Sequence, residues 1–171
     1  MIAVIVYLSA IVIANLTLLW FGPTASVFNA FLLIGLDLSL RDKLHDRWHR
    51  KNLWIKMLAL ICGGSAITIA LNWNALDIAL ASATAFLLAG VGDALVYSKL
   101  KGESFLIRSN GSNIAGSAID SIVFPTMAFG IFMPEIIVAQ FCAKLAGGGI
   151  WSWVLDSRKL KLKSMNHQKG L

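Results

Sequence analysis

Apolar residues dominate the chain in long stretches that shorter polar segments separate. Each stretch holds roughly the 20 residues that an α-helix needs to cross a hydrocarbon core about 30 Å thick. The pattern predicts six transmembrane helices, at about Met1–Phe21, Thr24–Leu40, Leu53–Leu71, Ala75–Tyr97, Asn113–Phe132 and Glu135–Leu155. We therefore expect an all-α, polytopic membrane protein with one compact domain over residues 1–155 and a basic tail over residues 156–171.

The composition supports a protein that resides in a lipid bilayer. Hydrophobic residues make up 57% of the chain, charged residues only 14%, and the mean hydropathy is +0.73. These values are far from the balance of an ordinary soluble domain. A soluble protein is therefore not expected.

The basic residues lie on alternate connections between the apolar stretches. Of the 15 Lys and Arg residues, all except Lys56 and Lys144 lie in the second-to-third connection, the fourth-to-fifth connection or the tail. Basic residues of short loops stay on the cytoplasmic side of a membrane. We therefore expect a protein of the bacterial inner membrane with both termini on the cytoplasmic side. Contact with anionic lipid accounts for the pI near 9.6, so no nucleic-acid partner is expected.

A polar stripe enters the fifth stretch. Asn110, Asn113, Ser117 and Asp120 follow one another at offsets that place them on one face of a helix. Because uncompensated polar groups inside a membrane cost several kcal/mol, such a stripe indicates a binding site.

The sixth stretch carries polar residues that can complete this site. Gln140 precedes Lys144 by four residues and so shares its helix face. Asp120 and Lys144 can neutralise each other across neighbouring antiparallel helices, and a purely structural ion pair is the alternative reading. The resulting cluster of Asn113, Ser117, Asp120, Gln140 and Lys144 suits a flat polar heterocycle, although a small amide or an ion would also fit.

Other acidic residues lie closer to the helix ends. Asp93 lies about one turn inside the cytoplasmic end of the fourth helix, and Asp37 lies near the cytoplasmic end of the second. Because burial disfavours a charged carboxylate, Asp120 or Asp93 can carry a coupling proton. Sodium coupling and facilitated diffusion remain open.

The residues resemble the vitamin uptake transporter family, also called queuosine precursor transporters. The resemblance rests first on Arg108-Ser109-Asn110, Asn113, Asp120-Ser121 with Phe124, and Lys144. It extends over most of the chain to Asn15, Asp37, Ala81, Ser82, Ala85, Phe86 and Asp93. One departure is Arg41-Asp42, where family members commonly carry an acidic residue four positions after Asp37.

The resemblance implies an uptake protein for 7-deazaguanine precursors of the modified base queuosine, such as 7-cyano-7-deazaguanine. Asp120 is then the main substrate carboxylate with Asn110, Asn113 and Ser117 beside it, and Gln140 and Lys144 serve the acceptor edge of the ring. Asp93, Asp37, Asn15 and Arg108 are coupling or structural residues. The departure at Arg41 bears on the identity of the cargo.

Two other classes of membrane protein remain as alternatives. Gly90-Val91-Gly92-Asp93 matches the short GxGD string of intramembrane aspartyl proteases, for which Asp37 is the best second carboxylate. The substrate-binding subunit of an ATP-driven vitamin importer also has six helices, and Ala10 and Ala14 have the spacing of a helix-docking face. No phosphate-binding loop of the P-loop type occurs, so ATP use would require ATPase partner chains.

We expect a transporter rather than an enzyme, with no cofactor and no metal. His45 and His49, with Asp42 and Asp46 nearby, have the spacing of a metal site, but contact with lipid headgroups is the favoured reading. The expected partners are a small-molecule substrate and membrane lipids, and self-association remains open.

Overall fold

The computed structural model describes residues 2–48 and 52–168, and within this part of the chain the regular structure is entirely helical. The predicted all-α fold class is thereby confirmed. The elements in chain order are α1 (Ile2–Phe21), α2 (Pro23–Asn29), the π-helical segment η1 (Ala30–Ile34), α3 (Gly35–Trp48), α4 (Leu53–Leu71), the 3-10 turn η2 (Trp73–Ala75), α5 (Leu76–Lys99), α6 (Phe105–Phe129) and α7 (Pro134–Gln168).

The second predicted helix is one long rod made of α2, η1 and α3. Gly22 provides the turn from α1, because its φ of 69° lies in a region that residues with a Cβ rarely adopt. Pro23 follows at the first helical position, where its missing N–H is not needed. The π-helical segment Ala30–Ile34 then changes the direction in which the following side chains point.

Three of the predicted helix boundaries are wrong by about two turns or more. Helix α3 ends at Trp48 rather than Leu40. Helix α6 begins at Phe105 rather than Asn113, because Ser104 caps it by accepting a hydrogen bond from the Ile107 N–H at 3.5 Å. The polar run before Asn113 is therefore helical. Helix α7 continues beyond Leu155 to Gln168, so the backbone of the basic tail is an extension of the last helix.

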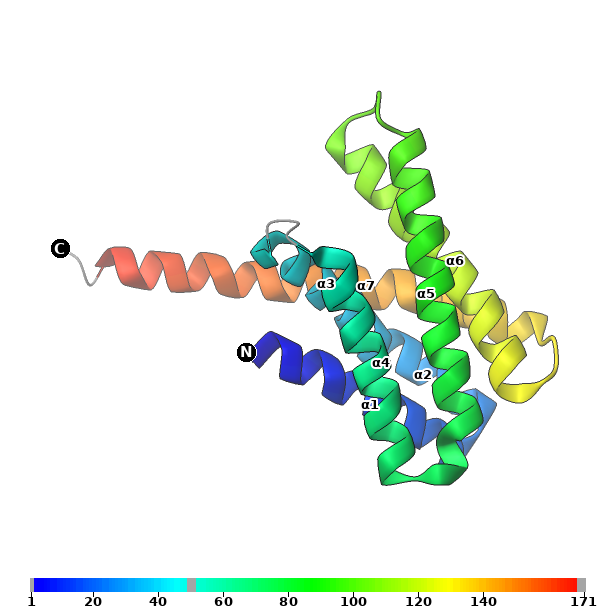
Figure 1. The fold of residues 1–171 in the computed structure, drawn as a ribbon. Helices are drawn as coiled ribbons and strands as arrows, with labels where there is room; N and C mark the ends of the chain where they lie inside the picture. The colour runs from blue at the N-terminus through cyan, green and yellow to red at the C-terminus, as the bar shows by residue number, and fades with distance from the viewer. Residues whose placement is uncertain (1, 49–51, 169–171) are drawn as a thin grey trace.

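The ends of the helices lie toward the left and top of the bundle or toward its bottom and right, and the connection after α5 is at the top (Figure 1). In Figure 1 the N-terminal end of α1 and the C-terminal end of α7 both lie on the left, whereas the connections after α4 and α6 lie at the bottom and right. Helices α5 and α6 pack along each other as an antiparallel hairpin. A core of apolar residues joins α1, α3 and α4, and it contains Tyr7, Ile11, Leu40, Leu44, Met57 and Leu60.

Glycines allow α7 to lie unusually close to η1 and α3. A Cβ on Gly147 would collide with the Phe31 carbonyl group, and a Cβ on Gly35 would lie 2.7 Å from the Gly147 backbone. Small residues at such crossings are typical of membrane helices. Gly147 therefore serves packing, and α7 continues through the run Gly147–Gly149 without a break.

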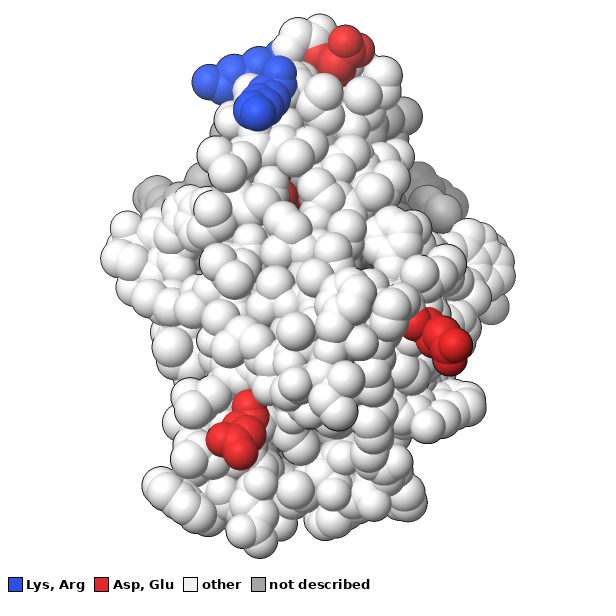
Figure 2. Space-filling view, turned by 90° about the vertical axis from the view of Figure 1, so that its right-hand side faces the viewer, with Lys and Arg blue, Asp and Glu red and all other residues white. Residues whose placement is uncertain are grey.

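The surface of the bundle is strongly apolar. Figure 2 shows a face that is almost uncharged, with Lys and Arg at its upper tip and a few acidic residues. Among the described residues, four segments are long and apolar enough to cross a membrane: Ile2–Phe21, Pro23–Arg41, Trp54–Leu71 and Trp73–Lys99. Helices α6 and α7 lie outside this set, and they are the two that carry the predicted polar cluster. These four segments support the prediction of a membrane protein.

Candidate functional site

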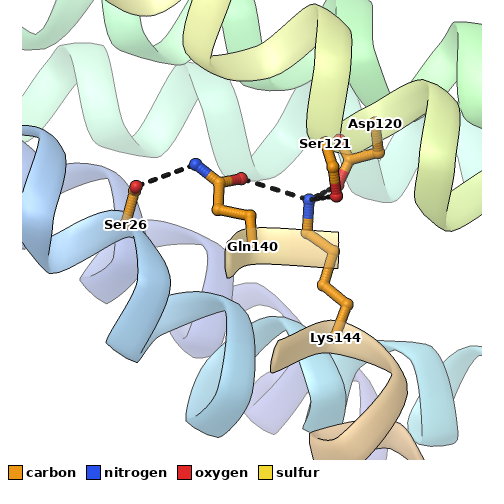
Figure 3. A network of polar contacts seen from close by, with 5 residues as sticks. All are labelled: Ser26, Asp120, Ser121, Gln140 and Lys144. Atoms are coloured by element: carbon orange, nitrogen blue, oxygen red, sulfur yellow. Dashed lines mark hydrogen bonds and ion pairs between the residues drawn. The ribbon is translucent and has the colours of Figure 1, made fainter. Parts of the chain in front are cut away.

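A buried ion pair joins α6 and α7 in the interior of the bundle. The Lys144 ammonium lies 2.6 Å from the Asp120 carboxylate, and the two side chains are only 2% and 10% exposed. Lys144 also donates a hydrogen bond of 3.0 Å to the Ser121 hydroxyl. The ammonium thus has both a counter-charge and a neutral acceptor on α6 (Figure 3).

Gln140 extends this network to α2. Its amide oxygen accepts a hydrogen bond of 3.3 Å from Lys144, and its amide nitrogen donates one of 2.8 Å to the Ser26 hydroxyl. These two bonds fix the orientation of the amide group, which is 1% exposed. The network of Ser26, Asp120, Ser121, Gln140 and Lys144, hereafter the central network, connects three helices (Figure 3).

Local structure explains why these side chains meet. Gln140 and Lys144 are one helical turn apart on α7, so both face the same neighbours. The close approach at Gly147 brings this part of α7 against η1, next to Ser26 on α2. Pro125 lies one turn beyond Ser121 in α6, where it removes one helical hydrogen bond near the site.

A small cavity adjoins the central network. It has a volume of about 20 Å³, which is room for about one water molecule. Helix α1 contributes Ala14, Asn15 and Leu18 to its wall, and the other lining residues are Ser26, Asn29, Ala30, Ile34, Ser82, Phe86, Asp120, Phe124, Gln140 and Lys144. In this conformation the site is closed around its own side chains.

Two buried asparagines, Asn15 and Asn29, line this cavity, hereafter the central cavity. Asn15 donates to the Thr68 hydroxyl at 3.4 Å, which ties α1 to α4. Asn29 donates to the Ala14 carbonyl at 3.0 Å and to the Thr17 hydroxyl at 2.8 Å, which ties α2 to α1. Each amide thus holds helices together while bordering the cavity.

The predicted stripe on α6 divides into separate environments. Asp120 joins the central network, whereas Asn113 accepts a hydrogen bond of 3.3 Å from Arg41 on α3. Ser117 is buried, and its hydroxyl has no hydrogen-bond partner among the described residues. Asn110 is exposed at the other end of the stripe, and the side chain of Arg108 lies outside the described part of the structure.

Sequence reasoning missed several residues of the site. Ser121 directly follows Asp120 and was available as a signal, because a hydroxyl in an apolar helix needs a partner. Ser26 and Asn29 are also polar residues in a predicted apolar helix, but only the crossing of α2 with α1 and α7 shows which partners they meet. Arg41 was noted as a departure from the family pattern, and the structure places it on Asn113.

A second and larger cavity lies beside the first, between α3, α4 and α5. This lateral cavity has a volume of about 410 Å³. Its polar lining residues are Tyr7, Asp37, Arg41 and Asp93, and its apolar walls include Met57, Ile61 and Phe86. Both carboxylates named for the protease alternative thus border one cavity. Neither Asp37 oxygen has a hydrogen-bond partner among the described residues, so the paired carboxyl groups of an aspartyl protease are not formed in this conformation.

A family model described as "Putative vitamin uptake transporter" matches residues 2–155 of the chain. The match includes all of α1 to α6 and the part of α7 that carries Gln140 and Lys144. No curated protein and no solved structure matches the chain.

Proposed function

The chain belongs to the vitamin uptake transporter family, and on that premise we propose that it takes up a small polar heterocycle, a 7-deazaguanine precursor of queuosine such as 7-cyano-7-deazaguanine. The observation that carries the proposal is the central network, a buried ion pair with an oriented amide beside a cavity. Ionised side chains are rare at such depth in membrane helices and mark substrate paths.

The chemistry of the central network matches the edge of such a ring. The ring N–H and the exocyclic amino group of a guanine-like base are parallel donors, which a carboxylate such as Asp120 accepts well. Lys144 and the Gln140 amide nitrogen are donors for the carbonyl and ring-nitrogen acceptors. Without ligand, Lys144 and Asp120 neutralise each other. Substrate binding then exchanges internal hydrogen bonds for bonds to the ring, so little charge is left uncompensated.

We further propose that the chain crosses the bacterial inner membrane six times, with both termini on the cytoplasmic side. In support of this, α6 and α7 direct Asp120, Gln140 and Lys144 inward, where they are buried. The same helices expose apolar side chains, among them Ile114, Ile122, Val138 and Ile150. Hence both helices offer lipid an apolar surface despite their lower hydropathy. The alternating ends in Figure 1 agree with an even number of spans.

Reconstitution tests the cargo and the need for partner chains together. The full-length chain is purified, placed in liposomes and supplied with labelled 7-cyano-7-deazaguanine, with protein-free liposomes as the control. We expect uptake by this chain alone, with competition by unlabelled deazaguanines and none by unrelated vitamins. Uptake that occurs only when ATPase chains are added would favour the ATP-driven importer. Competition by a vitamin and not by deazaguanines would refute the proposed cargo.

A further inference from the structure

The lateral cavity is the only one of the two described cavities that can hold a ring-sized molecule. Its volume of about 410 Å³ compares with about 20 Å³ for the central cavity. Pockets for small organic ligands fall in the range of about 300–1,000 Å³. A heterocycle therefore fits the lateral cavity without any rearrangement, whereas the central site must open to admit it.

Several polar atoms in the lateral cavity lack hydrogen-bond partners among the described residues, although the charge of Arg41 lies within electrostatic reach of Asp37. Asp37 is 3% exposed and lines the cavity, yet neither of its carboxylate oxygens has a hydrogen-bond partner among the described residues. One oxygen of Asp93 and the Arg41 Nε atom are likewise buried without a partner there. Buried polar groups are almost always satisfied, and an unpaired carboxylate in apolar surroundings is especially costly. A bound molecule that presents N–H donors would satisfy both carboxylates.

The walls of the lateral cavity favour a flat ligand. Met57, Ile61 and Phe86 provide apolar surface around the polar groups. Trp54, Leu58 and Val91 also line the cavity and are 63%, 46% and 51% exposed, so they form its open edge between α4 and α5. A planar ring with donors on one edge matches this combination of apolar walls and carboxylates.

The lateral and central cavities are neighbours. Ile34 of η1 and Phe86 of α5 line both, and they are the only residues common to the two linings. Tyr7 lines the lateral cavity and lies within electrostatic reach of Asp37 and of Asp120 in the central network. A ligand in the lateral cavity is therefore separated from the central site by the Ile34 and Phe86 side chains.

We infer that the lateral cavity is a second binding site for the transported molecule. Its ligand is a planar heterocycle with adjacent N–H donors, Asp37 is the carboxylate that accepts them, and Phe86 with Ile34 separates this site from the central network. The inference rests on the proposed function, because it assigns a second site to the same substrate. A lipid chain is the competing occupant, but it would leave both carboxylates without donors.

Gly90 offers a way to fill this cavity without disturbing the fold. It lines the lateral cavity, and a Cβ built on it would meet no atom within 4 Å. Gly149 on α7 is a matched control, because its Cβ would also meet nothing and it does not line either cavity. Gly90→Phe occupies the space of a ring inside the lateral cavity, whereas Gly149→Phe places the same side chain outside both cavities.

The test measures equilibrium binding of labelled 7-cyano-7-deazaguanine to the purified full-length chain in lipid nanodiscs. We expect Gly90→Phe and Asp37→Asn to weaken binding about tenfold or more, with Gly149→Phe close to the unsubstituted chain. Melting temperatures of all variants, followed by tryptophan fluorescence, separate lost binding from lost folding.

Each other outcome overturns the inference in a recognisable way. If Gly90→Phe folds and binds the probe as the unsubstituted chain does, the lateral cavity is not a substrate site and the proposed function stands. If Gly90→Phe only displaces co-purified lipid, the occupant is lipid. If the unsubstituted chain neither binds nor transports the probe, the proposed function fails and the assigned ligand fails with it.

Discussion

The Lys144 ammonium and the Asp120 carboxylate lie 2.6 Å apart in the interior of the bundle, with α7 supplying the cation and α6 the anion. Removing one member leaves the other charge buried without its partner. Breaking a buried pair in this way costs roughly 3–5 kcal/mol, whereas replacing both members is often close to neutral. The pair is therefore a source of fragility as well as the centre of the proposed site.

We predict that Asp120→Asn and Lys144→Gln each lower the stability of the purified protein by roughly 3–5 kcal/mol. The double variant is expected to recover most of this loss, because two amides can hydrogen-bond where the ions did. Denaturation in detergent, followed by tryptophan fluorescence, gives the free energy of unfolding of each of the three variants. Strictly additive losses would show that the two charges do not depend on each other. Asp77→Asn, at an exposed carboxylate of α5, is the control.

Gln140 provides a second and independent test of the central network. Replacement by Leu removes the bonds to Ser26 and Lys144 while keeping a similar volume. We expect substrate affinity to fall by up to about tenfold, since a hydrogen bond between the Gln140 amide and a neutral ring contributes roughly 0.5–1.5 kcal/mol. Binding of labelled 7-cyano-7-deazaguanine measures this. Thr84→Val, which removes a hydroxyl bonded to its own helix in α5, is expected to leave affinity unchanged.

The close contact between α7 and η1 predicts that position 147 tolerates no side chain larger than that of glycine. A methyl group on Gly147 would collide with the Phe31 carbonyl, so Gly147→Ala must push the two segments apart. We expect a loss of about 1–3 kcal/mol in stability. Gly149→Ala meets open space and is expected to be neutral or slightly stabilising. Equal melting temperatures for the two variants would contradict the close crossing.

The proposed topology predicts which connections face the cell exterior. Cys62 and Cys142 are free and exposed, so both are first replaced by Ser. A cysteine at Asn74, between α4 and α5, is then expected to react with a membrane-impermeant maleimide added to intact cells. A cysteine at Gly102, between α5 and α6, is expected to react only after lysis. The reverse pattern would invert the orientation, and equal labelling would refute the number of spans.

Much of the fold could be predicted because apolar length alone determines where a membrane helix runs. The α4 bounds, Leu53–Leu71, agree with the prediction. The start of α6 was not found, because polar residues before Asn113 suggested a loop although Ser104 offered a capping signal. The π-helical segment at Ala30–Ile34 has no such signal, since it depends on how the rod packs against α7.

The site was predictable only in part. Charges in apolar helices are conspicuous, and the predicted encounter of Asp120 with Lys144 is present in the structure. The contact of Asn113 with Arg41 depends instead on how α3 crosses α6, which spacing along one helix does not reveal. Asp37 and Asp93, in contrast, were already paired on the sequence because both lie near cytoplasmic helix ends, and both line the lateral cavity.

The most direct test of substrate binding at the central network is uptake by the double variant, Asp120→Asn with Lys144→Gln. Stability is expected to be preserved in this variant, so lost uptake would reflect the site rather than the fold. We predict that cells expressing it accumulate no labelled 7-cyano-7-deazaguanine above the empty-vector background, whereas cells expressing Asp77→Asn match the unsubstituted chain. Normal uptake by the double variant would contradict the assignment of this ion pair as the substrate site.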